Sequence, residues 1–193
     1  EGFSVAVFYK DFADPIEAVT VGGGSDDRGV RTFANAESAE LYGIEFDGRY
    51  NLDNFFGADS IWRDFYVAGN LALIESEVTV GESNLGVGTN NKRELQGQSP
   101  WVVNTRFGYS NIVNGTEAVL LLNVSGENIV EAGVNGIPDA EEQSRPMLDF
   151  NLSQIVLDDW TVGLKVRNLL DSEFEVKQGN LTQRGFETGT SVS

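Results

Sequence analysis

The segment LYGIEFDGRYN, residues 41–51, alternates bulky apolar residues with charged ones at every second position. A helix would scatter the two kinds around its axis, whereas an extended strand places the apolar residues on one face and the charges on the other. The apolar set is Tyr42, Ile44, Phe46 and Tyr50, and the charged set is Glu45, Asp47 and Arg49. The segment therefore predicts a β-strand with two unlike faces.

The same alternation recurs along the chain in eight strand-like runs. They cover residues 2–12, 36–51, 65–78, 95–109, 117–127, 146–157, 160–170 and 185–193, the last of them truncated. The runs exceed the ~5–6 residues of an ordinary soluble strand. An all-β chain is therefore predicted.

The connectors between the runs alternate in length, which predicts the topology. Long stretches rich in Gly, Asn, Asp and Glu follow the odd-numbered runs, at residues 19–31, 81–93, 128–144 and 171–184. Short turns follow the fourth and sixth runs, at residues 111–116 and 158–159, and a longer aromatic turn follows the second, at 52–62. Long loops at one end and tight turns at the other are typical of a membrane β-barrel. The pattern predicts an antiparallel, up-and-down transmembrane β-barrel, with the long loops outside and the short turns in the periplasm.

The composition argues against several classes of function. The 193 residues include 30 acidic and 13 basic ones, a formal charge of −17, so no nucleic-acid partner is expected. The chain contains no Cys and no His. A disulfide framework, a zinc–thiolate site, a cysteine nucleophile and a Ser-His-Asp triad are therefore excluded. We predict no enzyme and no cofactor; no catalytic, cofactor-binding or metal-ligating residue is assigned, and the ligand-binding residues stay unknown.

Periodicity leaves two alternatives open. One is a complete eight-stranded outer-membrane barrel acting as an anchor or adhesion protein, in which the first run would pair with the eighth. The other is a soluble ligand-binding β domain, because a β-sandwich or a lipocalin-type barrel also alternates with period two. The soluble fold would use its apolar face as a core.

Four short segments carry a more specific signal. Residues 3–17 contain Phe8-Tyr9-Lys10 followed by Asp14-Pro15-Ile16-Glu17, and residues 35–46 read NAESAELYGIEF. Residues 95–104 read LQGQSPWVVN, and residues 166–171 read VRNLLD. Each resembles a barrel element of the TonB-dependent outer-membrane receptors, and they occur in that family's order across nearly the whole chain.

The resemblance implies that the chain is part of a larger receptor. Proteins of the family have a 22-stranded barrel closed by an N-terminal plug, with a segment that engages TonB. No plug is visible, so we expect residues 1–193 to be a partial β-barrel domain, the C-terminal region and about the last third of a receptor, with its last strand truncated. The expected location is the bacterial outer membrane. The implied partners are the TonB complex, through the missing plug region, and outer-membrane lipid and lipopolysaccharide.

The implied function is that of the wall and extracellular loops of an importer. Its substrate would be a scarce small molecule such as a ferric chelate (siderophore), a vitamin or a glycan. The loops would capture the solute, and the plug would then rearrange to admit it.

Polar residues on the charged face of the runs are the first candidates for function. They are Glu45, Asp47, Arg49, Asn104, Arg106, Asp149, Asn151, Lys165 and Arg167. In a barrel they would face the lumen, where they could contact the plug or guide a solute. We expect instead that they are solvated wall residues paired across strands.

Acidic residues crowd the long connectors. They are Asp26, Asp27, Glu82, Glu127, Glu131, Asp139, Glu141, Glu142 and Glu173. Clustered carboxylates suit Ca²⁺, but EF-hand spacing is absent, so we expect a solubilising, mobile loop surface rather than a calcium site. Residues 22–24, Gly-Gly-Gly, lack the Gly-Lys-Ser/Thr ending of a phosphate-binding loop and predict a flexible loop tip.

Overall fold

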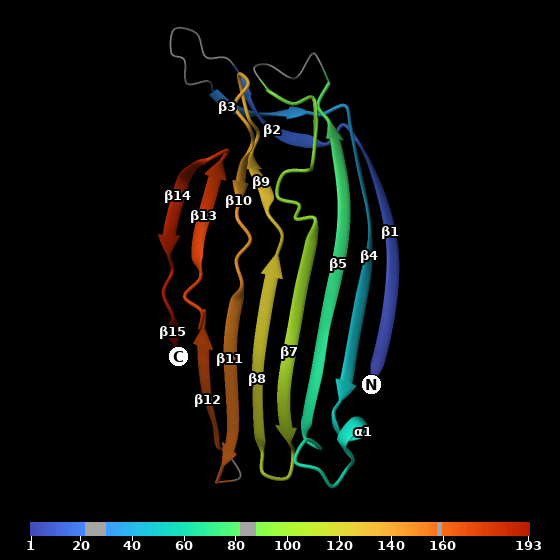
Figure 1. Ribbon diagram of the computed structural model, residues 1–193, viewed down its shortest axis with the longest axis vertical. Helices are drawn as coiled ribbons and strands as arrows, with labels where there is room; N and C mark the ends of the chain where they lie inside the picture. The colour runs from blue at the N-terminus through green and yellow to red at the C-terminus, as the bar shows by residue number, and fades with distance from the viewer. Residues whose placement is uncertain (22–29, 82–87, 158–159) are drawn as a thin grey trace.

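Eight strands in continuous order, with the short β6 (Lys92–Arg93) added beside β5, form one antiparallel sheet in the computed structural model, which describes residues 1–21, 30–81, 88–157 and 160–193 (Figure 1). Strands that are neighbours in the sheet also follow one another along the chain. In order they are β1 (Gly2–Ala13), β4 (Ser38–Asn51), β5 (Phe65–Thr79), β7 (Trp101–Asn111), β8 (Thr116–Ser125), β11 (Met147–Val156), β12 (Trp160–Arg167) and β15 (Ser191–Val192). Each overlaps one predicted run, so the all-β, up-and-down arrangement is confirmed.

The sheet is open. β1 and β15 stand at opposite ends of the strand order, and within the described residues they do not pair with each other. The barrel is therefore not closed by these strands alone. A closed eight-stranded barrel would require the pairing of its first and last strands, which is not formed here.

Strand register gives the sheet two unlike faces. Phe46 of β4 lies opposite Leu71 of β5, which lies opposite Val103 of β7. One residue further along β4, Asp47 lies opposite Asn70 of β5. Because directly opposed residues in neighbouring strands share a face, apolar side chains gather on one side from β1 to β12 and polar side chains gather on the other. We call these sides the apolar face and the polar face.

The apolar face is exposed. Phe3, Val7 and Trp160 have 75%, 79% and 70% of their surface accessible. A soluble β-sandwich would cover such a face with a second layer and use it as a core. The predicted segregation of residues is thus confirmed, and these side chains do not form a dry interior.

The long connectors contain strands that were not predicted from the sequence. β2 (Ile16–Val21) and β3 (Val30–Asn35) form a hairpin between β1 and β4, and β6 (Lys92–Arg93) pairs with the end of β5. A separate four-stranded sheet has the order β14 (Leu181–Glu187), β13 (Glu173–Gln178), β10 (Ala140–Glu142) and β9 (Asn128–Glu131). These elements gather at one end of the long strands, which we call the loop end (Figure 1).

The eighth predicted run, residues 185–193, was wrongly assigned to a single strand. Its first part belongs to β14, where Phe186 stacks on Phe174 of β13 with 4.8 Å between ring centroids. Gly189 then adopts a φ of +73°, which lies in the left-handed region that glycine occupies without strain. Only Ser191 and Val192 rejoin the main sheet, next to β12.

Buried apolar side chains concentrate at the loop end. Ala36, Ala39 and Val78 form one buried cluster, against which Leu95 packs. Others buried at the same end are Val19, Val80, Ile129, Ala140 and Val176. The core therefore lies where the long connectors pack against the ends of the long strands, since Ala39 belongs to β4 and Val78 to β5.

Aromatic rings line the opposite end, which we call the turn end. The turn between β4 and β5 contains the short helix α1 (Asp53–Phe56). Phe56 stacks on Trp62 at 5.5 Å, Trp62 meets Phe65 edge-on at 5.3 Å, and Phe65 stacks on Phe107 at 5.5 Å between centroids. Among the described residues, no helix combines the length and the apolar character needed to cross a membrane. The predicted turn at residues 158–159 lies outside the described residues.

Candidate functional site

A row of amide side chains crosses the polar face. Strand register aligns Asn70 of β5, Asn104 of β7 and Asn123 of β8. The amide nitrogen of Asn123 donates to the Asn104 oxygen at 2.5 Å, and that of Asn104 donates to the Asn70 oxygen at 2.8 Å. Asn70 in turn donates to the Glu45 carboxylate at 3.4 Å. Hydrogen bonds between side chains thus connect four adjacent strands.

Charged residues flank the amide row in a hollow of about 610 Å³. Arg49 and Arg106 lie on opposite sides of the small residue Ala68 in the strand register, and Asp47 and Asp149 also line the hollow. The guanidinium of Arg49 lies over the ring of the buried residue Tyr66, 3.8 Å from its centroid. This contact orients Arg49 without neutralising its charge.

All nine predicted inward residues lie on the polar face, as the register shows. Five of them line the hollow: Asp47, Arg49, Asn104, Arg106 and Asp149. The other four, Glu45, Asn151, Lys165 and Arg167, lie beyond its lining. Pairing across strands is seen for Glu45 and Asn104, which join the amide row by hydrogen bonds, whereas no salt bridge among the described residues involves any of the nine. Pairing across the strands is carried by amide side chains, with the Glu45 carboxylate as the last acceptor.

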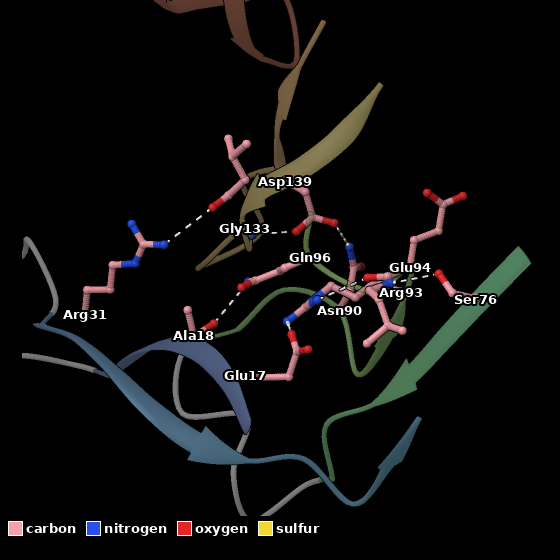
Figure 2. A network of polar contacts seen from close by, with 12 residues as sticks. Glu17, Ala18, Arg31, Ser76, Asn90, Arg93, Glu94, Gln96, Gly133 and Asp139 are labelled. Atoms are coloured by element: carbon pink, nitrogen blue, oxygen red, sulfur yellow. Dashed lines mark hydrogen bonds and ion pairs between the residues drawn. The ribbon is translucent and has the colours of Figure 1, made fainter. Parts of the chain in front are cut away.

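A buried ion pair holds the β2–β3 hairpin at the loop end (Figure 2). The guanidinium of Arg93 lies 2.8 Å from the Glu17 carboxylate, and only 4% and 6% of the two side chains is exposed. Arg93 also donates to the backbone carbonyl of Glu94 at 3.2 Å. Close by, the amide of Gln96 donates to the backbone carbonyl of Ala18 at 3.1 Å.

The ion pair lies on the polar-face side of the sheet. Arg93 is opposite Val78 of β5, which shares its face with Asn70 by strand alternation. The preceding residue, Lys92, projects to the other side, where it pairs with Glu77 at 2.7 Å and both side chains are well exposed. The hairpin that Glu17 belongs to therefore packs against the inner, polar side of the loop end.

Residues 88–99 connect this hairpin to the segment that contains β9 and β10. The backbone N–H of Gly97 donates to the carbonyl of Ile129, and that of Thr89 donates to the carbonyl of Gly133, both at 2.8 Å. The Asp139 carboxylate accepts from the Gly133 N–H at 2.5 Å and from the Asn90 amide at 3.3 Å. We call residues 16–21, 30–35, 88–99 and 128–142 together the mouth assembly.

Four of the acidic connector residues that the structure describes lie in strands, whereas Glu127 and Asp139 lie outside them. Glu131 lies in β9, Glu141 and Glu142 in β10, and Glu173 in β13, so the expectation of a purely solvated, mobile surface does not hold for them. Burial raises the pKa of Glu141, and the charges of Glu127, Asp139 and Glu94 raise it further. Asp26, Asp27, Glu82 and the glycines at 22–24 lie outside the described residues. Within the described part, acidic side chains do not gather into a group suited to a metal ion.

Sequence reasoning missed the pairing of Glu17 with Arg93. The two residues are 76 positions apart: Arg93 ends the predicted connector 81–93, and Glu17 lies just before the predicted connector 19–31. Neither the local pattern nor the overall charge distinguishes them from the other charged residues of the connectors. Only the folding of two connectors against each other brings them together.

Fold and site together define the class of this protein. An antiparallel, up-and-down sheet with an exposed apolar face and a hollowed polar face is a segment of a transmembrane β-barrel wall. The family described as TonB dependent receptor-like, beta-barrel matches residues 1–169, and the chain belongs to that family. Its members are receptors and transporters of the bacterial outer membrane. No curated protein and no solved structure matches the chain.

Proposed function

We propose that this chain forms wall and mouth of a TonB-dependent receptor that imports a scarce solute across the bacterial outer membrane. The solute would be a ferric chelate, a vitamin or a glycan. The observation that carries the proposal is the segregation of the sheet into an exposed apolar face and a hollowed polar face, in a chain that belongs to this family.

The two faces perform different physical tasks in this proposal. The apolar face contacts lipid hydrocarbon, where Phe, Val and Leu side chains gain the free energy that a soluble protein gains in its core. The polar face meets the aqueous lumen and the plug region, and the amide row satisfies its own hydrogen bonds there. Arg49 and Arg106 keep charges available in the hollow, because neither is engaged in a salt bridge among the described residues. The TonB complex supplies energy through the plug, and lipopolysaccharide surrounds the barrel wall in the outer leaflet.

Adjacent cysteines test the assignment of the faces. Val103 lies on the apolar face and Val102 on the polar face, and the chain has no cysteine of its own. In the full-length receptor in lipid vesicles, a fluorophore on Val103→Cys should be quenched by brominated lipid, whereas one on Val102→Cys should not. Equal quenching at both positions, or quenching of Val102→Cys alone, would contradict the proposal.

Uptake by intact cells tests the transport step. Cells that carry the receptor should accumulate a radiolabelled ferric siderophore, cobalamin or oligosaccharide, and deletion of TonB should abolish that accumulation. Accumulation that persists without TonB would contradict the proposal. Efficient cross-linking of β1 to β15 in the membrane would indicate a closed anchor barrel, and a monodisperse protein without detergent would indicate a soluble domain.

A further inference from the structure

The β2–β3 hairpin spans a wide part of the loop end. In Figure 1 its strands run across the upper ends of the long strands rather than along them. Near its base, Glu17 binds Arg93 beside β5, and on its second strand Arg31 donates to the carbonyl of Val130 in β9 at 3.5 Å. From β4 to β8 the sheet advances by three strands, or roughly 14 Å at ~4.8 Å per strand. The hairpin therefore bridges parts of the mouth that the long strands hold apart.

The hairpin has one inner and one outer face. Glu17 and Val19 are buried on the inner face, with Ala34 directly opposite Glu17. On the outer face, Ile16 and Phe33 are 72% and 73% exposed. The inner face is directed at the polar-face side of the wall, because Arg93 projects from that side.

We infer that the hairpin, through residues 16–21 and 30–35, is a strap held across the mouth. Glu17 and Arg93 are the positioning residues that hold this strap against the polar-face side of the wall. This inference rests on the proposed function, because it makes the strap a determinant of the size of solute that passes. The buried ion pair suits this role. Removing one partner leaves the other charge buried and unpaired, which is strongly unfavourable, so the strap cannot stay in place without both.

The neighbouring ion pair supplies a matched control. Lys92 of β6 pairs with Glu77 of β5 at 2.7 Å, but the two lie on the apolar-face side with 61% and 58% of their side chains exposed. An exposed pair of this kind contributes little to stability. Lys92→Met therefore removes a charge one residue from Arg93 and leaves the strap untouched.

Cysteine labelling in the full-length receptor tests the position of the strap. A single cysteine at Ala34 reports the inner face, and one at Phe33 reports the outer face. With a bulky, membrane-impermeant maleimide, Phe33→Cys should react rapidly and Ala34→Cys slowly. Adding Glu17→Gln should accelerate Ala34→Cys roughly tenfold or more, because the unpaired Arg93 charge expels the strap. Lys92→Met should change neither rate.

A second variant covers the case in which Glu17→Gln does not fold. Gln96→Leu removes only the hydrogen bond to the Ala18 carbonyl, and it should accelerate labelling of Ala34→Cys in the same direction by a smaller factor. Equal labelling of Ala34→Cys and Phe33→Cys in the parent receptor would overturn the inference. So would an Ala34→Cys rate that neither variant changes.

Reagents of graded size test the consequence for selection. A cysteine at Ala72 lies on the polar face below the strap, in the row that contains Glu45 and Val102. The largest external maleimide that still reacts with Ala72→Cys should increase in size when Glu17→Gln is added, but not when Lys92→Met is added. An unchanged size limit would overturn the role in selection. Neither labelling experiment requires uptake, so a failure of the transport proposal would be seen separately in the cell assay.

Discussion

The strand wall and the mouth assembly are stabilised in opposite ways. The wall, from β1 to β12, buries few side chains and leaves its apolar face open, as Val7 at 79% exposure illustrates. The loop end, where the mouth assembly lies, contains most of the buried apolar residues of the described chain, including Val78 and Val176 at 0% exposure. It also holds the buried Glu17–Arg93 pair. The wall therefore depends on the surrounding medium and on neighbouring strands, whereas the mouth depends on contacts within itself.

This difference follows from the solvent that each region meets. In hydrocarbon every backbone polar group must be paired, and long antiparallel strands achieve this while exposing apolar side chains. At the loop end, water surrounds the chain, so burial of apolar surface again becomes the main stabilising term. The wall of this chain therefore exposes its apolar side chains, whereas the loop end buries them as a soluble protein does.

The largest effect should come from a charge placed on the apolar face. Leu120 and Leu121 are adjacent in β8 but lie on opposite faces, since Leu120 is opposite Phe107 and Leu121 is opposite Arg106. Leu120→Arg should destabilise the membrane-inserted receptor by about 2–4 kcal/mol, whereas Leu121→Arg should cost much less. Denaturant titration of the full-length receptor folded into vesicles measures both. Equal losses of stability in the two variants would show that the two faces of the wall do not meet different environments.

A smaller effect is expected from crowding in the mouth assembly. A Cβ atom at Gly133 would lie 2.1 Å from the carbonyl oxygen of Ile137, whereas one at Gly163, in β12, would lie 3.8 Å from its nearest neighbour, the carbonyl oxygen of Leu152. Gly133→Ala should therefore destabilise the mouth by about 1–3 kcal/mol, and Gly163→Ala should be tolerated.

Limited proteolysis of the folded receptor distinguishes the two glycine variants. Cleavage within the mouth should accelerate in Gly133→Ala while the wall stays intact. If Gly133→Ala resists proteolysis as well as the parent receptor does, the mouth accommodates the added Cβ atom at little cost. The contrast between the two regions would then be weaker than the structure indicates.

The smallest effect should come from Glu141 in the mouth assembly. Burial, followed by the charges of Glu127, Asp139 and Glu94, raises the pKa of Glu141 above its ordinary value. The folded mouth therefore binds the proton more tightly than the unfolded chain does, so its stability should rise as the pH falls through the raised pKa. Glu141→Gln should confer part of this gain at neutral pH and remove that part of the pH dependence. Proteolysis rates of the mouth between neutral and mildly acidic pH measure this pH dependence of stability. A proteolysis rate that rises on acidification in the parent receptor, but not in Glu141→Gln, would show that protonation of Glu141 destabilises the mouth and would contradict the prediction.

The wall could be predicted closely because its signal is local. Alternation in residues 41–51 assigned Phe46 and Asp47 to opposite faces, and the register with Leu71 and Asn70 confirms this. A strand places side chains by position alone, so the pattern needs no knowledge of distant residues. The eighth run shows the limit of such reasoning, because a left-handed glycine and the stacking of Phe186 on Phe174 divide a continuous pattern between two sheets.

The site was predictable only in part. The polar-face residues were identified, but their pairing was not, because a period of two says which face a side chain occupies and not which partner it meets. Asn104 bonds to Asn70 and Asn123 because the register aligns three amides in one row. Arg49 remains outside any salt bridge among the described residues because its row partner in β5 is Ala68.

By itself the sequence determined the strand order, the two faces and the family, since each of these depends on spacing along the chain. Tertiary structure alone decided that the connectors fold into a packed mouth, and that Glu17 meets Arg93 there. The physical reason is that burial and ion pairing at the loop end depend on residues brought together from distant segments, for which the local sequence carries no periodic signal. The alternation can be recognised from neighbouring residues, whereas the contacts at the loop end form only when the chain folds.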